Sequence, residues 1–517
     1  MIKSRTKNVS RNMLVALICQ FASLILNFVS RTVFVKTLGI DYLGVNGLFT
    51  NVLTVLSFAE LGIGNAMIFS MYKPLAQEDT QKLASLMHLY KKAYQIIGTI
   101  VALVGLGVLP FLNVVIKDGS NVNESIEILY LLFLANSVVS YFFVYKKSII
   151  IADQKNYIVL LLTEGIHIIQ IIIQIVFLLI TRNYIVFLLI QIGCTFLGNI
   201  IASIVANKLY PFLKGKPKEL DKVERKHIFK NVRALAVYKF GSVVLNGTDN
   251  ILVSSLVGVT SVGLVSNYVL LNTACNSILG KVTEGFTASV GNLNAVADSQ
   301  KQYDIFKKIF FITAWLYGFV TVALIVLGHK FVSLWIGPEY LVDSLTAIAI
   351  VLGFYVQGVH FAAYTYRTTL GLFTQAQITP LLAAIFNIVL SIILCNKIGL
   401  AGIFIATPIS RLITTGTIDP ILIYKKVFRK NPLKYYSIYA GYMILFSGIA
   451  IICNYLCGLV ALAGWLGLIL QAVIVLFVFN ILMLLIFGSN KMFREILRSG
   501  LMLFHKKNND KSENKCI

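Results

Sequence analysis

Charged and amide side chains lie at helical spacing inside apolar segments of this chain. In the segment 12–36, Gln20, Asn27 and Arg31 fall on one face of a helix, together with Ser23. A charge at the centre of a bilayer costs at least about 2.5–3.5 kcal/mol, so such residues persist where they face a hydrated cavity or pair with each other. The spacing therefore predicts a polar helix face that lines a cavity or a contact between helices.

Five further apolar segments carry similar polar stripes. These are Lys239, Asn246, Asp249 and Asn250; Ser277, Lys281 and Glu284; Gln357, His360, Tyr364 and Arg367; Glu164, His167 and Gln174; and Arg411 with Asp419. Pro408 and Pro420 flank the last pair, and we expect them to distort that helix. Stripes on six segments can enclose one hydrated chamber.

The members of these stripes form the predicted site. We expect substrate contacts from Arg31, Lys281, Lys239, Arg411, Asn27, Gln20, Asn246, Asn250, Gln357, His360 and Tyr364. We expect contacts with a coupling ion from Asp249, Glu164, Glu284 and Asp419. A chamber of mixed, partly cationic charge suits an anionic substrate rich in hydroxyl groups, because guanidinium groups bind phosphate bidentately. The alternative interpretation is that the stripes only hold helices together by hydrogen bonds, with Lys281 and Glu284 neutralising each other.

Several classes of function are disfavoured by what the sequence lacks. No GxxxxGK[ST] loop is present, so the chain is not a pump that carries its own ATPase. The six histidines and seven cysteines are dispersed and match no zinc or disulfide spacing. We therefore expect no enzyme activity, no metal and no cofactor. The net charge of +23 lies in loops without a basic-aromatic binding module, so we expect no nucleic-acid partner.

The composition requires most of the surface to lie in lipid. Of the 517 residues, 57% are hydrophobic and 13% are charged, whereas soluble domains need about 25% charged residues. Spanning helices need roughly 20 mostly apolar residues. Fourteen segments qualify, namely 12–36, 43–71, 86–116, 125–150, 157–181, 184–206, 235–256, 262–294, 306–328, 341–366, 377–396, 400–423, 437–457 and 461–487. We predict an all-α polytopic membrane protein.

The basic residues orient these segments. With a cytoplasmic N-terminus, the inner segments hold 36 of the 45 Lys and Arg residues and the outer loops hold five. The positive-inside rule expects this asymmetry. We therefore predict that both termini are cytoplasmic.

A shift of 219 residues aligns two parts of the chain. Gly39 falls on Gly258 and Gly44 on Gly263, each time between the first and second helices of a six-helix set. Two such sets insert with the same orientation, as parallel repeats around an axis along the membrane normal do. The predicted division is a tail at 1–11, an N-lobe at 12–206, a basic linker at 207–234, a C-lobe at 235–434, two further helices at 435–487 and a tail at 488–517.

The segments Leu43–Phe49 and Leu56–Ala66 resemble the polysaccharide transporter family, as do Tyr72–Ala76 and Tyr90–Tyr94. That family includes the Wzx-type oligosaccharide flippases, in a superfamily with the MATE exporters and the MurJ lipid II flippase. The resemblance implies that the chain flips an undecaprenyl-diphosphate-linked oligosaccharide across the bacterial cytoplasmic membrane by alternating access, for polysaccharide biosynthesis. It places Arg31 at the family's basic position on helix 1 and Lys281 at that on helix 8. Helix 2 carries Glu60 in place of a cation.

The implied partners are the lipid-linked oligosaccharide and membrane lipids, together with a polysaccharide polymerase and glycosyltransferases. We expect a monomer, because one chain supplies both lobes. Three alternatives remain open: a MATE-like cation-coupled exporter of cationic drugs, a lipid II flippase, and a membrane scaffold of a polymer-assembly complex. An exporter of cations would favour an acidic cavity, and a scaffold would tolerate substitution of Arg31 and Lys281.

Overall fold

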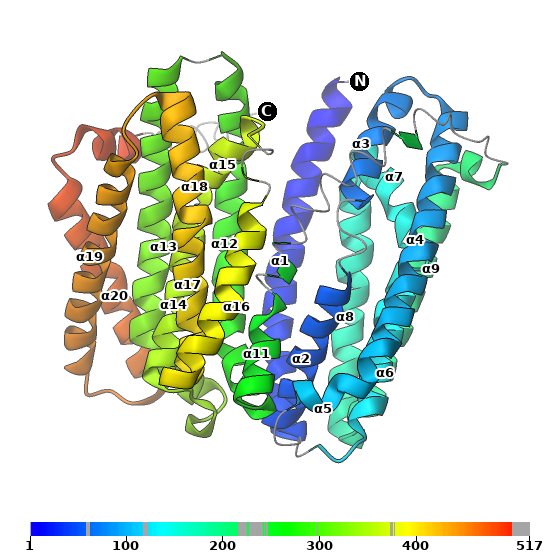
Figure 1. The fold of residues 1–517 in the computed structure, drawn as a ribbon, viewed down its shortest axis with the longest axis horizontal. Coiled ribbons are helices and arrows are strands. Elements are labelled where there is room, and N and C mark those ends of the chain that lie inside the picture. The colour runs from blue at the N-terminus through cyan, green and yellow to red at the C-terminus, as the bar shows by residue number, and fades with distance from the viewer. Residues whose placement is uncertain are drawn as a thin grey trace, which may run out of the picture. The chain divides into compact units, whose positions relative to one another are not determined.

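The computed structural model describes residues 2–57, 63–116, 122–215, 225–226, 241, 243–244, 247–296, 298–372, 376 and 378–498, and side chains from Ile18 onward. All regular elements in these ranges are helices (Figure 1). The chain divides into two compact units. Unit 1 comprises Met1–Leu270 and Gln377–Ser410, and unit 2 comprises Leu271–Ala376 and Arg411–Ile517.

Unit 1 contains the first nine α-helices, which are α1 (Ile2–Leu38), α2 (Ile40–Leu56), α3 (Ile63–Ala76), α4 (Thr80–Val108), α5 (Leu112–Val115), α6 (Ile126–Tyr141), α7 (Lys147–Ala152), α8 (Asn156–Thr181) and α9 (Tyr184–Leu209). It also contains α11 (Asp249–Leu256), the start of α12 (Val259–Val296), α16 (Thr379–Ile398) and most of α17 (Leu400–Ile413). Several helices begin where a side chain caps the first backbone N–H groups. Asp79 accepts from the Lys82 N–H and Asn183 from the Val186 N–H.

Unit 2 contains the rest of α12 and then α13 (Ser299–Trp335), α14 (Ser344–Val359), α15 (Phe361–Thr369), α18 (Thr415–Ile423), α19 (Leu433–Gly458) and α20 (Gly464–Phe487). Its core is strongly aromatic: Phe306, Phe310 and Tyr435 pack ring against ring between α13 and α19. Such ring pairs stabilise a core beyond the area they bury.

Twelve helices among the described residues are long and apolar enough to cross a membrane, and each corresponds to one of the predicted segments. The prediction of an all-α polytopic protein is confirmed. The segment 43–71 is represented by α2 and α3 on either side of 58–62, and only parts of the segment 235–256 are described. The count of fourteen therefore stays a prediction.

Two of the long apolar segments are interrupted. α14 gives way to α15 at His360, and α17 gives way to α18 at Thr414. Pro408 lies inside α17 and Pro420 inside α18, and the segment is interrupted between them, at Thr414, rather than at either proline. Interrupted backbone at membrane depth is tolerated where side chains satisfy the freed polar groups or where the break lines a cavity.

The aligned glycines lie at a close contact of helices within unit 1. Gly39 and Gly258 both have positive φ, at 97° and 143°, and each precedes a helix start. A Cβ on Gly44 would collide with the Val259 carbonyl oxygen, and one on Gly263 would collide with the Ile40 carbonyl oxygen. In both places the backbone is too close for a side chain, so only glycine fits at these two positions. Thr260 donates a hydrogen bond to Asp41, and the two residues are 219 positions apart, which is the shift that aligns the repeat. Equivalent positions of the repeat thus contact each other, as expected for a local two-fold relation.

Candidate functional site

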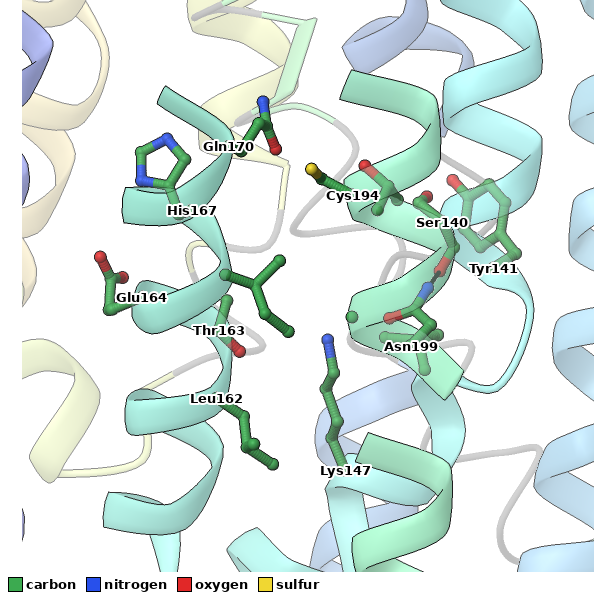
Figure 2. Close-up of a pocket in the computed structure, with 14 residues that line it drawn as sticks. Ser140, Tyr141, Lys147, Leu162, Thr163, Glu164, His167, Gln170, Cys194 and Asn199 are labelled. Atoms are coloured by element: carbon green, nitrogen blue, oxygen red, sulfur yellow. Dashed lines mark hydrogen bonds between the residues drawn. The ribbon is translucent and has the colours of Figure 1, made fainter. Parts of the chain in front are cut away.

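A cavity of about 400 Å³ lies within unit 1 among α6, α7, α8 and α9 (Figure 2). The α8 side chains Glu164, His167 and Gln170 line it, and Asn199 lines it from α9. Lys147, the first residue of α7, extends into the space between α8 and α9 (Figure 2). The volume of this cavity is within the range of small-molecule sites.

Hydrogen bonds hold the polar wall of this cavity in place. Ser23 on α1 donates to Glu164 Oε2 at 2.6 Å. Asn199 Nδ2 donates to the Ser140 carbonyl at 3.0 Å, where α6 is about to end, and Thr195 donates to Asn136 Oδ1 at 2.9 Å. The predicted stripe on the segment 157–181 therefore divides. Glu164 and His167 face the cavity, whereas Gln174 donates to the Phe187 carbonyl and joins α8 to α9.

The cavity offers one ammonium group, one carboxylate, one imidazole and several amides and hydroxyls. The lining holds one lysine, Lys147, and one carboxylate, Glu164, so its fixed charges are equal in number, and the two side chains lie on opposite sides of α8 (Figure 2). Such a lining can donate to and accept from neutral hydroxylated groups at many positions, with only one carboxylate available to an organic cation.

Arg31 lies on α1, half-buried with the neighbouring stripe residues Gln20 and Asn27. Its Nη1 donates to Ser266 Oγ on α12 at 2.8 Å. The guanidinium group of arginine has five N–H donors in a planar fork. The bond to Ser266 uses one of them, and the remaining donors can bind a phosphate.

A second polar cluster in unit 1 surrounds Asp249 at the start of α11. Thr407 on α17 donates to Asp249 at 3.3 Å, and Asn387 on α16 donates to Thr407 Oγ1 at 2.9 Å. Asn387 and Ser391 are fully buried, and in the described part of the chain no hydrogen-bond partner reaches Asn387 Oδ1 or Ser391 Oγ. An unsatisfied buried polar group costs about 1–3 kcal/mol.

Carboxylate, amide and hydroxyl oxygens are the ligands that hard cations prefer, so the cluster around Asp249 fits a bound cation. Asn250, the next residue of α11, is half-buried.

In unit 2, Asp419 lies between two basic residues. Arg367 Nε is 3.1 Å from Asp419 Oδ1, and His360 Nε2 is 3.1 Å from Asp419 Oδ2. His360 Nε2 also lies 3.1 Å from the Thr415 carbonyl, at the start of α18 after the helix break. Tyr364 lies over the Arg367 guanidinium at 5.3 Å from ring centroid to Cζ. This cluster joins α15 to α18.

The remaining predicted residues are dispersed or undescribed. Lys281 and Arg411 are half-buried on α12 and α17, and Gln357 is exposed on α14. Lys239, Asn246 and the side chain of Glu284 lie outside the described residues. The structure links Asp249 to Thr407 and, through it, to Asn387, two residues that the sequence analysis did not single out. Their polarity within apolar segments was the available signal.

Searches by sequence found no protein-family model that matches the chain, and no curated protein matches it. Searches by structure found clear fold neighbours. The lipid II flippase MurJ in an inward closed conformation has a TM-score of 0.63 and 19% identity, over 92% of this chain and 99% of that one. An inward-facing multidrug resistance MATE family transporter of the MOP superfamily has a TM-score of 0.62 and 13% identity, over 78% of this chain and 95% of that one.

A third neighbour is a MOP superfamily transporter from Pyrococcus furiosus whose binding pocket is described as having reverse polarity, suggesting a different function. It has a TM-score of 0.57 and 12% identity, over 83% of this chain and 97% of that one. At these identities the likeness concerns the fold. The chain has the fold of MOP superfamily transporters.

Proposed function

We propose that this chain is a membrane transporter that flips a polyprenyl-diphosphate-linked oligosaccharide between the leaflets of a bacterial cytoplasmic membrane. The observation that carries the proposal is the cavity among α6–α9, whose amides, hydroxyls, Lys147 and Glu164 suit a hydroxylated head group. The fold of flippases and exporters and the resemblance of Leu43–Phe49 and Leu56–Ala66 to oligosaccharide flippases support it. In this proposal the chain acts as a monomer with cytoplasmic termini. The oligosaccharide that it flips is the substrate of a polysaccharide polymerase.

The lipid tail can remain in the bilayer while the head group crosses through the protein. This removes most of the cost of moving hydrated sugars through hydrocarbon, because the head group exchanges water for polar side chains. We assign the diphosphate to Arg31 on α1, whose Nη1 donates to Ser266 and whose remaining donors can meet a phosphate. The sugar contacts are the residues of the α6–α9 cavity, and the two lobes alternate between inward- and outward-open states.

The Asp249 cluster is the proposed coupling site. A cation held by Asp249, Thr407 and Asn387 would satisfy the buried Asn387 oxygen, which has no hydrogen-bond partner among the described residues. We expect wild-type flipping in proteoliposomes to respond to an imposed sodium or proton gradient and Asp249→Asn to lose that response while retaining gradient-independent flipping. An unchanged gradient response in Asp249→Asn would refute this assignment.

A MATE-like drug exporter is the second candidate, because the same fold carries it. Organic cations bind best to sites with excess negative charge, and the balance of Lys147 against Glu164 disfavours that substrate. A lipid II flippase differs from the main proposal only in the head group, and donors of different head groups distinguish the two.

The test is flipping of a fluorescent polyprenyl-diphosphate oligosaccharide in proteoliposomes. Arg31→Ala is compared with Lys36→Ala, which removes an exposed cation from the last turn of the same helix. We expect at least a tenfold loss of rate for Arg31→Ala, the equivalent of about 1.4 kcal/mol for a charge-assisted phosphate contact, and little change for Lys36→Ala. Equal rates in both variants would refute the role of Arg31. Absence of flipping by the wild type with several glycan donors, with transport of an organic cation, would replace the proposal by the exporter.

A further inference from the structure

A second cavity, of about 520 Å³, lies on unit 1 between α4 and the end of α6. Its base is formed by Tyr94 and Tyr141, which are buried, and Gly98 on α4 lies against Tyr141 at the end of α6. Leu103 and Phe142 line it and are exposed, at 65% and 48%. It is therefore an open, mostly apolar groove.

The groove is created by a strained break in the chain. α6 ends at Tyr141, and Phe143 adopts a left-handed conformation with φ 65° and ψ −11°. A bulky residue in this region costs about 1–3 kcal/mol and persists only where its surroundings enforce it. Asn199 enforces it here by donating to the Ser140 carbonyl, which the break frees. The break leaves Phe142 and Phe143 exposed on the wall of the groove.

Positive charge gathers at one end of the groove. Lys91 lines it one turn before Tyr94, and Lys91 lies close enough to Lys146 for their like charges to interact. Lys146 Nζ is held in place by Ser203 Oγ at 2.8 Å and Asn207 Oδ1 at 3.0 Å. In the part of the chain that the structure describes, Lys91 has no acidic partner. Two neighbouring ammonium groups without a carboxylate favour an anion at that place.

We propose that this groove binds an anionic phospholipid, with its phosphate at Lys91 and one acyl chain along Leu103, Val138 and Phe142. The charge selects an anionic head group, and the apolar walls select a lipid over a soluble phosphate. The end of the helices that carries Lys91 is also the end at which the basic loops lie, where anionic lipids of the cytoplasmic leaflet concentrate. This site is distinct from the transport cavity and does not depend on what the protein transports.

The experiment places a reporter in the groove. All three native tryptophans, Trp315, Trp335 and Trp465, lie in unit 2, so Phe142→Trp adds a fluorophore in the groove, and the signal of the parent chain is subtracted. The full-length protein is reconstituted in phosphatidylcholine vesicles with increasing fractions of dibrominated phosphatidylglycerol or dibrominated phosphatidylcholine. Quenching of the added tryptophan gives the relative affinity of the two lipids. Adding Lys91→Ala removes the proposed phosphate contact, and Lys92→Ala, an exposed neighbour that does not line the groove, is the control.

We expect phosphatidylglycerol to be preferred about fivefold, the factor for about 1 kcal/mol per lysine near an anionic head group. The preference should vanish in Lys91→Ala and persist in Lys92→Ala. Ala102→Phe, which narrows the groove without changing its charge, should weaken quenching by both lipids. The proposal is overturned if both lipids quench the Phe142→Trp variant equally while Lys91 is still present. It is also overturned if adding Lys91→Ala leaves the preference for phosphatidylglycerol unchanged. Displacement of the brominated lipid by a polyprenyl phosphate at much lower concentration would overturn it in favour of a substrate-tail site.

Discussion

The ion pair between Arg367 and Asp419 makes a sharp prediction about stability. Both side chains are 2% exposed, and the Nε–Oδ1 distance is 3.1 Å. Removing one partner of a buried pair leaves a charge in a medium of low polarity and costs about 3–5 kcal/mol. We therefore expect Asp419→Leu to be severely destabilising, with α15 losing its attachment to α18.

Removing both charges should cost far less. Replacement of a buried pair by apolar residues of similar volume is often neutral or stabilising. The double variant Arg367→Met/Asp419→Leu also loses the contact of Arg367 with the Tyr364 ring, worth about 0.5–2 kcal/mol. We expect the double variant to be more stable than Asp419→Leu by at least about 2 kcal/mol.

Cysteines provide the assay, two of them buried in unit 2 and one half-buried in unit 1. Cys453 and Cys457 lie buried in α19 of unit 2, whereas Cys194 lies in unit 1. Purified protein in detergent is heated at a fixed rate with a thiol-reactive label, and each cysteine is quantified by peptide mass spectrometry. Because unfolding of such proteins is commonly irreversible, variants are ranked by the temperature of half-labelling at one scan rate. In Asp419→Leu, labelling of Cys453 and Cys457 should move to lower temperature more than that of Cys194.

The control is an exposed ion pair of the same unit. Lys308 lies 2.8 Å from Glu495, with side chains 38% and 44% exposed, so Lys308→Ala should change labelling little. Equal destabilisation in the single and double variants would refute the argument, because the unpaired charge would then not be the cause. Wild-type labelling in Asp419→Leu would show that water reaches the cluster.

Two further predictions concern packing in unit 1. Gly263→Ala should lower the midpoint of thermal labelling at Cys194, since its Cβ would collide with the Ile40 carbonyl. Gly165→Ala, in α8 of the same unit, meets no atom within 4 Å and should be neutral or stabilising by up to about 1 kcal/mol. Equal midpoints in the two variants would contradict the close contact. Asn199→Leu should cost about 1–3 kcal/mol by leaving the Ser140 carbonyl without its donor, and labelling of Cys194 should accelerate if α6 ends as described.

Much of the fold could be predicted from the sequence because it depends on local chemistry. An apolar run of about 20 residues crosses a bilayer whatever its neighbours are, so twelve predicted segments correspond to the twelve apolar helices of the described residues. The matching glycines Gly39 and Gly258 indicated equivalent turns, and both have positive φ. The flanking prolines indicated the interruption that the structure places at Thr414.

The candidate site was predictable only in part, because it depends on how helices rotate against each other. The stripe of Gln20, Asn27 and Arg31 shares one helical face, but the spacing does not say which helix that face meets. Likewise, Asp249 was a candidate from its position alone, while Asn387 and Thr407 become its neighbours only when α11, α16 and α17 pack. The groove between α4 and α6 includes a break at Phe142–Phe143, where the sequence has neither proline nor glycine to mark it.

The structure also divides the acidic residues that the sequence analysis treated alike. Asp419 has both oxygens close to basic groups, so its charge is matched and it holds two interrupted helices together. Asp249 instead accepts from Thr407, which accepts from Asn387, a buried amide whose oxygen has no hydrogen-bond partner among the described residues. A cation at Asp419 would meet the positive charge of Arg367, whereas a cation at the Asp249 cluster would gain the unsatisfied oxygen of Asn387 as a ligand. The two interpretations of polar residues in spans, contact between helices and transport, therefore apply to different carboxylates of the same chain. Titrating the response to an ion gradient in Asp249→Asn and Asp419→Asn separates them, because only the first should lose the response while remaining fully folded.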